Sequence, residues 1–170
     1  MIIKTKHFGE IEICEEDIIN FYDGIPGFEG IEKYIIIENP SKNIPFNWLQ
    51  CVDNADLAFV IINPFIFKED YEFNLPQSAI EKLHIKSHED ISIYSIVTIP
   101  EDISKMSANL VAPIVINYVN KKGKQILLQD SGYNKKHLIL DEIRNSTVRN
   151  STVGNNSAKE QEELTTGEVF

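Results

Sequence analysis

Short runs of β-branched and aromatic residues follow one another closely along this chain of 170 residues. Isoleucine recurs in most of the runs, and their length suits strands better than helices. The runs cover residues 33–38, 46–51, 57–63, 91–99, 112–119 and 124–129. Residues 2–13 alternate in two shorter runs around Phe8 and Gly9, a pattern that predicts a hairpin.

The segments between the runs carry turn chemistry. Residues 53–56 (Asp-Asn-Ala-Asp) and 120–123 (Asn-Lys-Lys-Gly) predict hairpin turns. One helix is expected over residues 76–83, because Pro76 suits a first helical position. Short strands, tight turns and one short helix predict a mainly β single domain over residues 1–144, built as a small antiparallel barrel or sandwich.

The strand pattern ends near residue 145. Residues 145–170 are rich in Asn, Ser, Thr and Glu and hold few large apolar side chains. Burial of so few apolar groups gives little free energy to offset the entropy lost on ordering, so we expect a polar, disordered C-terminal tail.

Negative charge is concentrated in the N-terminal part of the chain. The formal net charge is −10, and residues 1–60 hold 11 acidic against 4 basic residues. Residues 61–144 hold 11 acidic against 10 basic residues. An acidic surface repels a phosphate backbone, which argues against direct binding to nucleic acid.

The sequence predicts a soluble, cytoplasmic protein. The N-terminus is charged and alternating, unlike the apolar core of a signal peptide. No apolar run approaches the roughly 18 residues that span a bilayer, so no membrane partner is expected. Cys14 and Cys51 lie far apart in sequence, and we expect both thiols to be free and reduced.

The stretch FYDGIPGFEG, residues 21–30, combines three glycines, one proline and three aromatic residues. A phosphate-binding loop would need a lysine and a Ser or Thr after its last glycine, and the first lysine here is Lys33. The nearby carboxylates Asp23, Glu29 and Glu32 would also repel phosphate. Pro26 and Gly27 instead suit the central positions of a type II turn, which predicts a stiff, acidic loop.

No residue pattern in the chain demands catalysis, a metal or a cofactor. His84 and His88 have a spacing that binds zinc on a helix, but no third ligand stands nearby, so we expect solvated histidines. No Gly-x-Ser-x-Gly elbow occurs, and neither cysteine has a nucleophile signature. An acid/base pair of carboxylates stays possible but has no support from the sequence.

Aromatic residues give the strongest remaining indication of function. Trp48, the single tryptophan, is expected to pack in the core. Residues 63–76 alternate four aromatic with three acidic residues between two prolines. This pattern is typical of a strand at the rim of a sheet, which is either an ordinary edge strand or a place where a partner docks.

Three long segments together resemble the flagellar assembly factor family FliW. They are GEIEICEEDIINFYDGIPGFEG, FNWLQCVDNADLAFVIINPFIFKEDYEFNLP and NLVAPIVINYVNKKGKQILLQD, and they occur in the order of the family's signature blocks. The resemblance covers about residues 1–140 and leaves the tail outside. It implies a non-enzymatic bacterial cytoplasmic protein with a small β-barrel-like fold and no cofactor.

The resemblance also implies two protein partners. One is flagellin, which the family holds as a chaperone before export. The other is CsrA, a small RNA-binding protein that represses flagellin translation. Free factor captures CsrA, and flagellin that accumulates occupies the factor and restores repression. We expect a monomer when neither partner is bound.

Candidate partner-binding residues follow from this role. We expect Glu29 and Glu32 to supply a negative field against CsrA, and Phe28, Phe65, Phe67 and Tyr71 to supply an apolar surface for flagellin. Asn117 and Gln125 are polar residues within strand-like runs, which either pin the barrel or face a partner. Two alternatives stay open, a structural module with one partner and a small β-barrel hydrolase.

Overall fold

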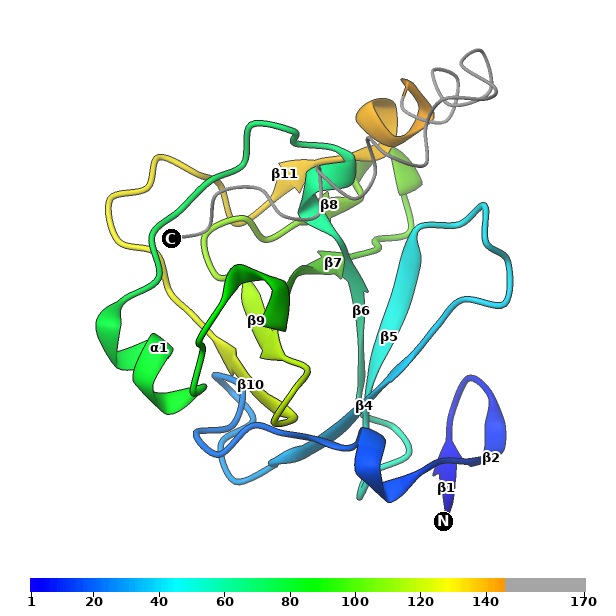
Figure 1. Cartoon of the computed structure of the whole chain (residues 1–170). Helices are drawn as coiled ribbons and strands as arrows, with labels where there is room; N and C mark the ends of the chain where they lie inside the picture. Colours follow the sequence, from blue (N-terminus) through cyan, green and yellow to red (C-terminus); the bar gives the residue numbers. More distant parts are fainter. Residues whose placement is uncertain (146–170) are drawn as a thin grey trace, which may run out of the picture.

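The computed structural model describes residues 1–145, and its strands are short and follow one another closely (Figure 1). The strands are β1 (Ile2–Thr5), β2 (Gly9–Glu12), β3 (Ile19–Asn20), β4 (Lys33–Ile37), β5 (Phe46–Cys51), β6 (Ala58–Ile62), β7 (Ile91–Thr98), β8 (Ser107–Ala108), β9 (Ile114–Asn117), β10 (Lys122–Gln125) and β11 (His137–Leu138). The helix α1 spans Gln77–Lys82, and four 3₁₀ turns are η1 (Glu15–Asp17), η2 (Pro64–Ile66), η3 (His88–Asp90) and η4 (Ile103–Lys105). Residues 140–145 are also helical.

Strand pairing closes a ring. The order runs from β7 through β6, β5, β4, β3 and β10 to β9, and β9 pairs back onto β7. All these pairs are antiparallel except β3 with β10, which meet in parallel at Asn20 and Lys122. Strands β8 and β11 extend the sheet beyond β7. The prediction of a mainly β, barrel-like fold is therefore confirmed.

The inside of the ring is filled by apolar side chains from most of its strands. They are Ile19, Phe21, Ile25, Tyr34, Leu49, Cys51, Ile61, Ile114 and Ile116. Adjacent residues in a strand point to opposite faces, so the neighbours of these residues face outward. Those neighbours need a cover of their own, because several are also isoleucine or valine.

Two segments cover the outer face of the sheet. The hairpin of β1 and β2 packs Ile3 and Ile13 against Ile35 of β4 and Val52. The second cover is larger and combines residues 65–85 with residues 126–139, over Ile62, Ile93 and Val115. Strands β9 and β6 are thus apolar on both faces, which explains their continuous rather than alternating sequence.

The hairpin predicted over residues 2–13 is present as β1 and β2, and the predicted turn over residues 53–56 and the helix are also present, but one predicted turn is misplaced. The turn between β9 and β10 occupies residues 118–121, with Lys121 at a φ of 55°. Gly123 instead lies within β10, where an added Cβ would overlap the ring of Phe21. The glycine therefore allows a strand to pack closely on an aromatic ring, and the prediction that it lies in a turn is wrong. The predicted disordered tail lies outside the described residues from 146 onward.

Candidate partner-binding surface

The loop of residues 21–30, which we call the opening loop, is a rigid turn, as predicted. The Phe28 N–H donates to the Ile25 carbonyl at 2.7 Å, and Gly27 has a φ of +88°. These are the hydrogen bond and the positive φ that a type II turn requires after proline. The Gly27 N–H also donates to Oε1 of Glu29 at 3.0 Å, and this bond lowers the pKa of that carboxyl. The loop thus presents Glu29 as an ionised group in a fixed place.

Phe28, Glu29 and Glu32 are all exposed, as expected for partner contacts. The ring of Phe28 stands edge-on to Phe59 of β6, with centroids 5.2 Å apart, and stays 37% exposed. Residues 1–145 place no ion-pair partner beside Glu29 or Glu32. Asp23 differs from them, because its carboxylate lies between Lys124 Nζ at 2.6 Å and Lys82 Nζ at 3.0 Å. These two lysines, Lys124 first, lower the pKa of Asp23.

The aromatic residues of the 63–76 segment do not form a surface. Phe65, Phe67 and Tyr71 are 4%, 7% and 2% exposed, and all three belong to the large outer cluster. The segment contains η2 and no strand, so the expected rim strand is wrong. Its aromatic side chains cover the outer face of the sheet, while Glu69, Asp70 and Glu72 face solvent. The alternation of aromatic and acidic residues reflects this covering role.

Asn117 pins the fold and is also not a surface residue. It is 1% exposed, and its Nδ2 donates to the carbonyl oxygens of Leu83 at 2.8 Å and His84 at 3.2 Å. These carbonyls end the helix α1, so Asn117 ties the helix to β9. Gln125 acts alike, donating from Nε2 to the Ala112 carbonyl at 3.0 Å. Burial resolves the open alternative for Asn117 in favour of a structural role, whereas Gln125 is half-buried and both of its alternatives stay predictions.

Trp48 lies between core and surface. Its side chain on β5 is half-buried, and its ring meets that of Phe8 edge-on with centroids 4.8 Å apart. Phe8 comes from the turn of the N-terminal hairpin, so Trp48 helps to seat that hairpin on the sheet. Core packing was the expectation, and the residue packs at the edge of the core.

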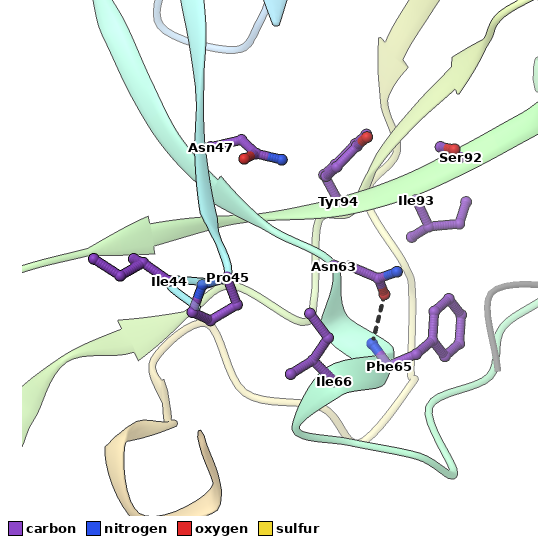
Figure 2. Close-up of a pocket in the computed structure, with 9 residues that line it drawn as sticks. All are labelled: Ile44, Pro45, Asn47, Asn63, Phe65, Ile66, Ser92, Ile93 and Tyr94. Carbon is purple, nitrogen blue, oxygen red and sulfur yellow. Dashed lines mark hydrogen bonds between the residues drawn. The ribbon is translucent and has the colours of Figure 1, made fainter. Parts of the chain in front are cut away.

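A hollow of about 340 Å³ lies where the start of β5 meets η2 and β7 (Figure 2). Ile44, Pro45 and Ile66 lie on one side of it, and the side chains of Asn47, Ser92 and Tyr94 on the other. Ile44 is 46% exposed and Ile66 is 38% exposed, which leaves two large apolar side chains at a concave site. Asn63 turns its side chain inward and accepts the Phe65 N–H at 2.9 Å, which fixes the start of η2.

Neither a membrane helix nor a metal cluster appears in the described part of the chain. No helix within residues 1–145 has the length and hydropathy to cross a bilayer. The same residues contain no group of three or more His, Cys, Asp and Glu side chains arranged to hold a metal ion. His84 and His88, the pair with zinc-like spacing, are both exposed, on the loop after α1 and on η3.

Comparison with known proteins identifies the family. The model of the FliW protein family matches residues 2–139. The chain belongs to the FliW family. The flagellar assembly factor FliW of Alkaliphilus metalliredigens (strain QYMF) is 56% identical to this FliW chain over 144 residues, which are 85% of the chain and 89% of that protein. The FliW of Bacillus pumilus (strain SAFR-032) is 43% identical over 139 residues, or 82% and 96% of the two chains.

A solved structure supports the same assignment for the fold. A crystal structure of the flagellar assembly factor FliW matches this FliW chain with a TM-score of 0.76 and 38% identity, covering 81% of the chain and 96% of that structure. The resemblance in sequence, the closed ring of strands and this match agree. The resemblance to a flagellar assembly factor is therefore confirmed.

Sequence reasoning missed the hollow and a group of lysines. Ile44 and Ile66 are 22 residues apart and belong to no shared pattern, so only the fold brings them together. Lys82, Lys122 and Lys124 likewise line one cleft from two separate elements, α1 and β10. The alternation of Lys122 and Lys124 around Gly123 was the available signal, but these residues had been assigned partly to a turn.

Proposed function

We propose that this FliW-family chain acts in the cytoplasm by binding two proteins and catalyses no reaction. One partner is CsrA, and binding of this chain to CsrA prevents CsrA from repressing flagellin translation. Flagellin is the other, held as by a chaperone before export. The observation that carries the proposal is the FliW family match, which spans nearly all of the described chain.

The CsrA contact is proposed at the opening loop. Glu29 follows the rigid turn directly and Glu32 lies between it and β4. Both are exposed and have no ion-pair partner within residues 1–145. An RNA-binding protein carries positive charge where RNA lies, so unpaired carboxylates here attract it and oppose phosphate. Charges act over about 8 Å at physiological salt, so these carboxylates act only beside the RNA path.

Charge reversal at Glu32 tests this contact. We expect Glu32→Lys to weaken CsrA binding about tenfold and to make binding less dependent on salt, because one attractive charge becomes repulsive. Glu32 is preferable to Glu29, whose carboxylate also accepts a hydrogen bond within the turn. Glu101→Lys makes the same change in net charge at another exposed position and serves as the control. Titration of labelled CsrA at several salt concentrations measures both; equal effects of the two variants would refute the site.

The flagellin contact is proposed at exposed apolar residues. With Phe65, Phe67 and Tyr71 buried, Phe28 is the one predicted aromatic residue that remains exposed. The hollow of Figure 2 adds Ile44 and Ile66. Amphipathic helical ends, which the family resemblance implies for flagellin, dock an apolar face into such a concave apolar site.

An exposed charge at the hollow tests the flagellin contact. Ile44→Asp should weaken flagellin capture about tenfold, because it places a carboxylate where an apolar side chain docks. Ile44 is 46% exposed, so the melting temperature should change little. The matched control is Ile103→Asp, at a 55% exposed position on η4. Flagellin that binds both variants like the parent protein would exclude the hollow, and Phe28→Ala then tests the loop in its place.

A further inference from the structure

Positive charge gathers at one cleft of this otherwise acidic protein. The cleft has a volume of about 180 Å³ and lies between the opening loop, the end of α1 and β10. Its lining includes Tyr22, Asp23, Lys82, Lys122 and Lys124, and we call it the lysine cleft. The whole chain has a formal net charge of −10, so the positive charge of the cleft is opposite in sign to that of the protein.

The fold sets the positions of the three lysines. Lys122 and Lys124 are alternate residues of β10 and therefore point to the same face, while Gly123 packs against Phe21 on the other. Lys82 is the last residue of α1. The end of this helix is held by Asn117 and by Asn120, whose Nδ2 atoms both donate to the Leu83 carbonyl, at 2.8 and 2.9 Å. Rigid elements thus present all three ammonium groups.

The lysines exceed the carboxylates that could balance them. Asp23 is shared between Lys82 and Lys124. Lys122 Nζ lies 5.6 Å from the ring centroid of Tyr22 and 3.4 Å from Nε2 of His84, and residues 1–145 offer it no ion pair. Three ammonium groups therefore face one carboxylate, and the cleft has room for further negative charge.

Charge and shape favour an acidic peptide as the occupant. A nucleic acid would bring many phosphates against the surrounding acidic surface, whereas a peptide brings a few carboxylates to one place. Residues in a strand rise about 3.3 Å each, so Lys122 and Lys124 match carboxylates on alternate residues of an extended chain. Tyr22 is 64% exposed beside the lysines and offers an apolar contact to a neighbouring side chain. The Asp23 carboxylate already accepts hydrogen bonds from two of the lysines, Lys82 and Lys124.

We propose that the lysine cleft binds an extended acidic segment of a protein partner, with carboxylates on alternate residues and an apolar residue beside them. This site differs from the acidic loop surface and from the hollow of Figure 2. It stands without the assignment of either CsrA or flagellin, because its ligand is defined by charge and spacing alone.

A pair of synthetic peptides tests the site on the full chain. The fluorescein-labelled peptide Leu-Glu-Ser-Glu-Leu should bind, and its analogue Leu-Gln-Ser-Gln-Leu should not, as measured by fluorescence anisotropy at low salt. Lys122→Glu should weaken binding of the acidic peptide about tenfold, because a positive side chain that attracts the peptide carboxylates is replaced by a negative one that repels them. Lys135→Glu makes the same charge change at an exposed position outside the cleft and should leave the affinity nearly unchanged.

Asp23→Asn is a second test, whose expected gain in affinity for the peptide could not be produced by misfolding. It removes the internal carboxylate that competes for Lys82 and Lys124, so it should tighten binding of the acidic peptide. Equal binding of the two peptides, an equal loss in Lys135→Glu, or weaker binding by Asp23→Asn would each overturn the proposal. Displacement of the peptide by inorganic phosphate, but not by chloride at equal ionic strength, would show a general anion site and would also overturn it.

Discussion

Two buried tyrosines differ in what meets their hydroxyl groups. The Tyr71 hydroxyl donates to the Leu110 carbonyl at 2.7 Å and so ties the covering segment to the chain between β8 and β9. The Tyr34 hydroxyl points into the inner core, where residues 1–145 give it no hydrogen-bond partner. An unpaired buried hydroxyl costs free energy, whereas a paired one contributes to stability.

Removal of the two hydroxyls should therefore have different effects at pH 7. Tyr71→Phe should lower the free energy of unfolding by about 1–2 kcal/mol, because the Leu110 carbonyl is left without its donor. Tyr34→Phe should leave that free energy unchanged or raise it. Urea titration of both variants measures the difference, and a larger loss in Tyr34→Phe would show that its hydroxyl has a partner in solution.

Tyr34 should also make the stability of the protein depend on pH in the alkaline range. Burial, with the nearby Cys51 thiol as a second cause, raises the pKa of Tyr34 to about 12 from the usual 10.0. The unfolded chain loses this proton near pH 10 and the folded chain only near pH 12, so the contribution is present below pH 10 and lost as pH rises through 12. Tyr34→Phe should lose less stability than the parent protein above pH 10, by up to about 3 kcal/mol. Identical alkaline curves would contradict this assignment.

Elements in this protein fit together through single close contacts as well as through strand pairing. β10 pairs with β9 over four residues but meets β3 at only one residue pair, so packing contributes strongly to the junction between β10 and β3. Gly123 supplies that packing by bringing the β10 backbone against the ring of Phe21, the first residue of the opening loop. The contact thus couples the strand that carries Lys122 and Lys124 to the loop that carries Glu29.

Gly123→Ala tests the contact between β10 and the loop. The added methyl group would overlap the Phe21 ring, so we expect a loss of about 1–3 kcal/mol in the free energy of unfolding. Phe21→Leu, which shortens the side chain, should restore part of the loss when the two are combined. Thermal melting of both single variants and the double variant measures this coupling. A double variant whose loss equals the sum of the single losses would show that the two positions do not interact.

Sequence patterns located most of the larger elements because these depend on local order. The runs that became β4, β5, β6 and β7 are long enough to be recognised, and residues 53–56 and Pro26-Gly27 carry their own turn chemistry. Strands β3, β8 and β11 have two residues each and exist only because a neighbour pairs with them. No local pattern marks such strands, since their stability comes from contacts distant in sequence.

At the scale of the whole molecule, burial on both faces of the sheet decided which site residues were predicted well. An aromatic residue looks the same in sequence whether it covers a sheet or contacts a partner, so Phe65, Phe67 and Tyr71 were misplaced. Glycine, proline and charge mark the opening loop locally, so the exposure of Phe28, Glu29 and Glu32 was predicted. The lysine cleft and the hollow each join distant segments and required the fold.

The fold presents surfaces of different character on one small barrel. Unpaired carboxylates lie on the opening loop, and apolar side chains border the hollow at the start of β5. Two partners that use one domain of this size are expected to affect each other's binding, either by overlap or through the rigid sheet between them. This interference is the central claim of the proposed function.

A competition titration tests that claim most directly. Fluorescent CsrA is first bound to the purified chain, and flagellin is then added in increasing amounts while anisotropy is followed. We predict that each protein binds the chain alone and that saturating flagellin releases CsrA or weakens its binding. If neither protein binds, or if both bind with affinities that do not depend on each other, the account is contradicted.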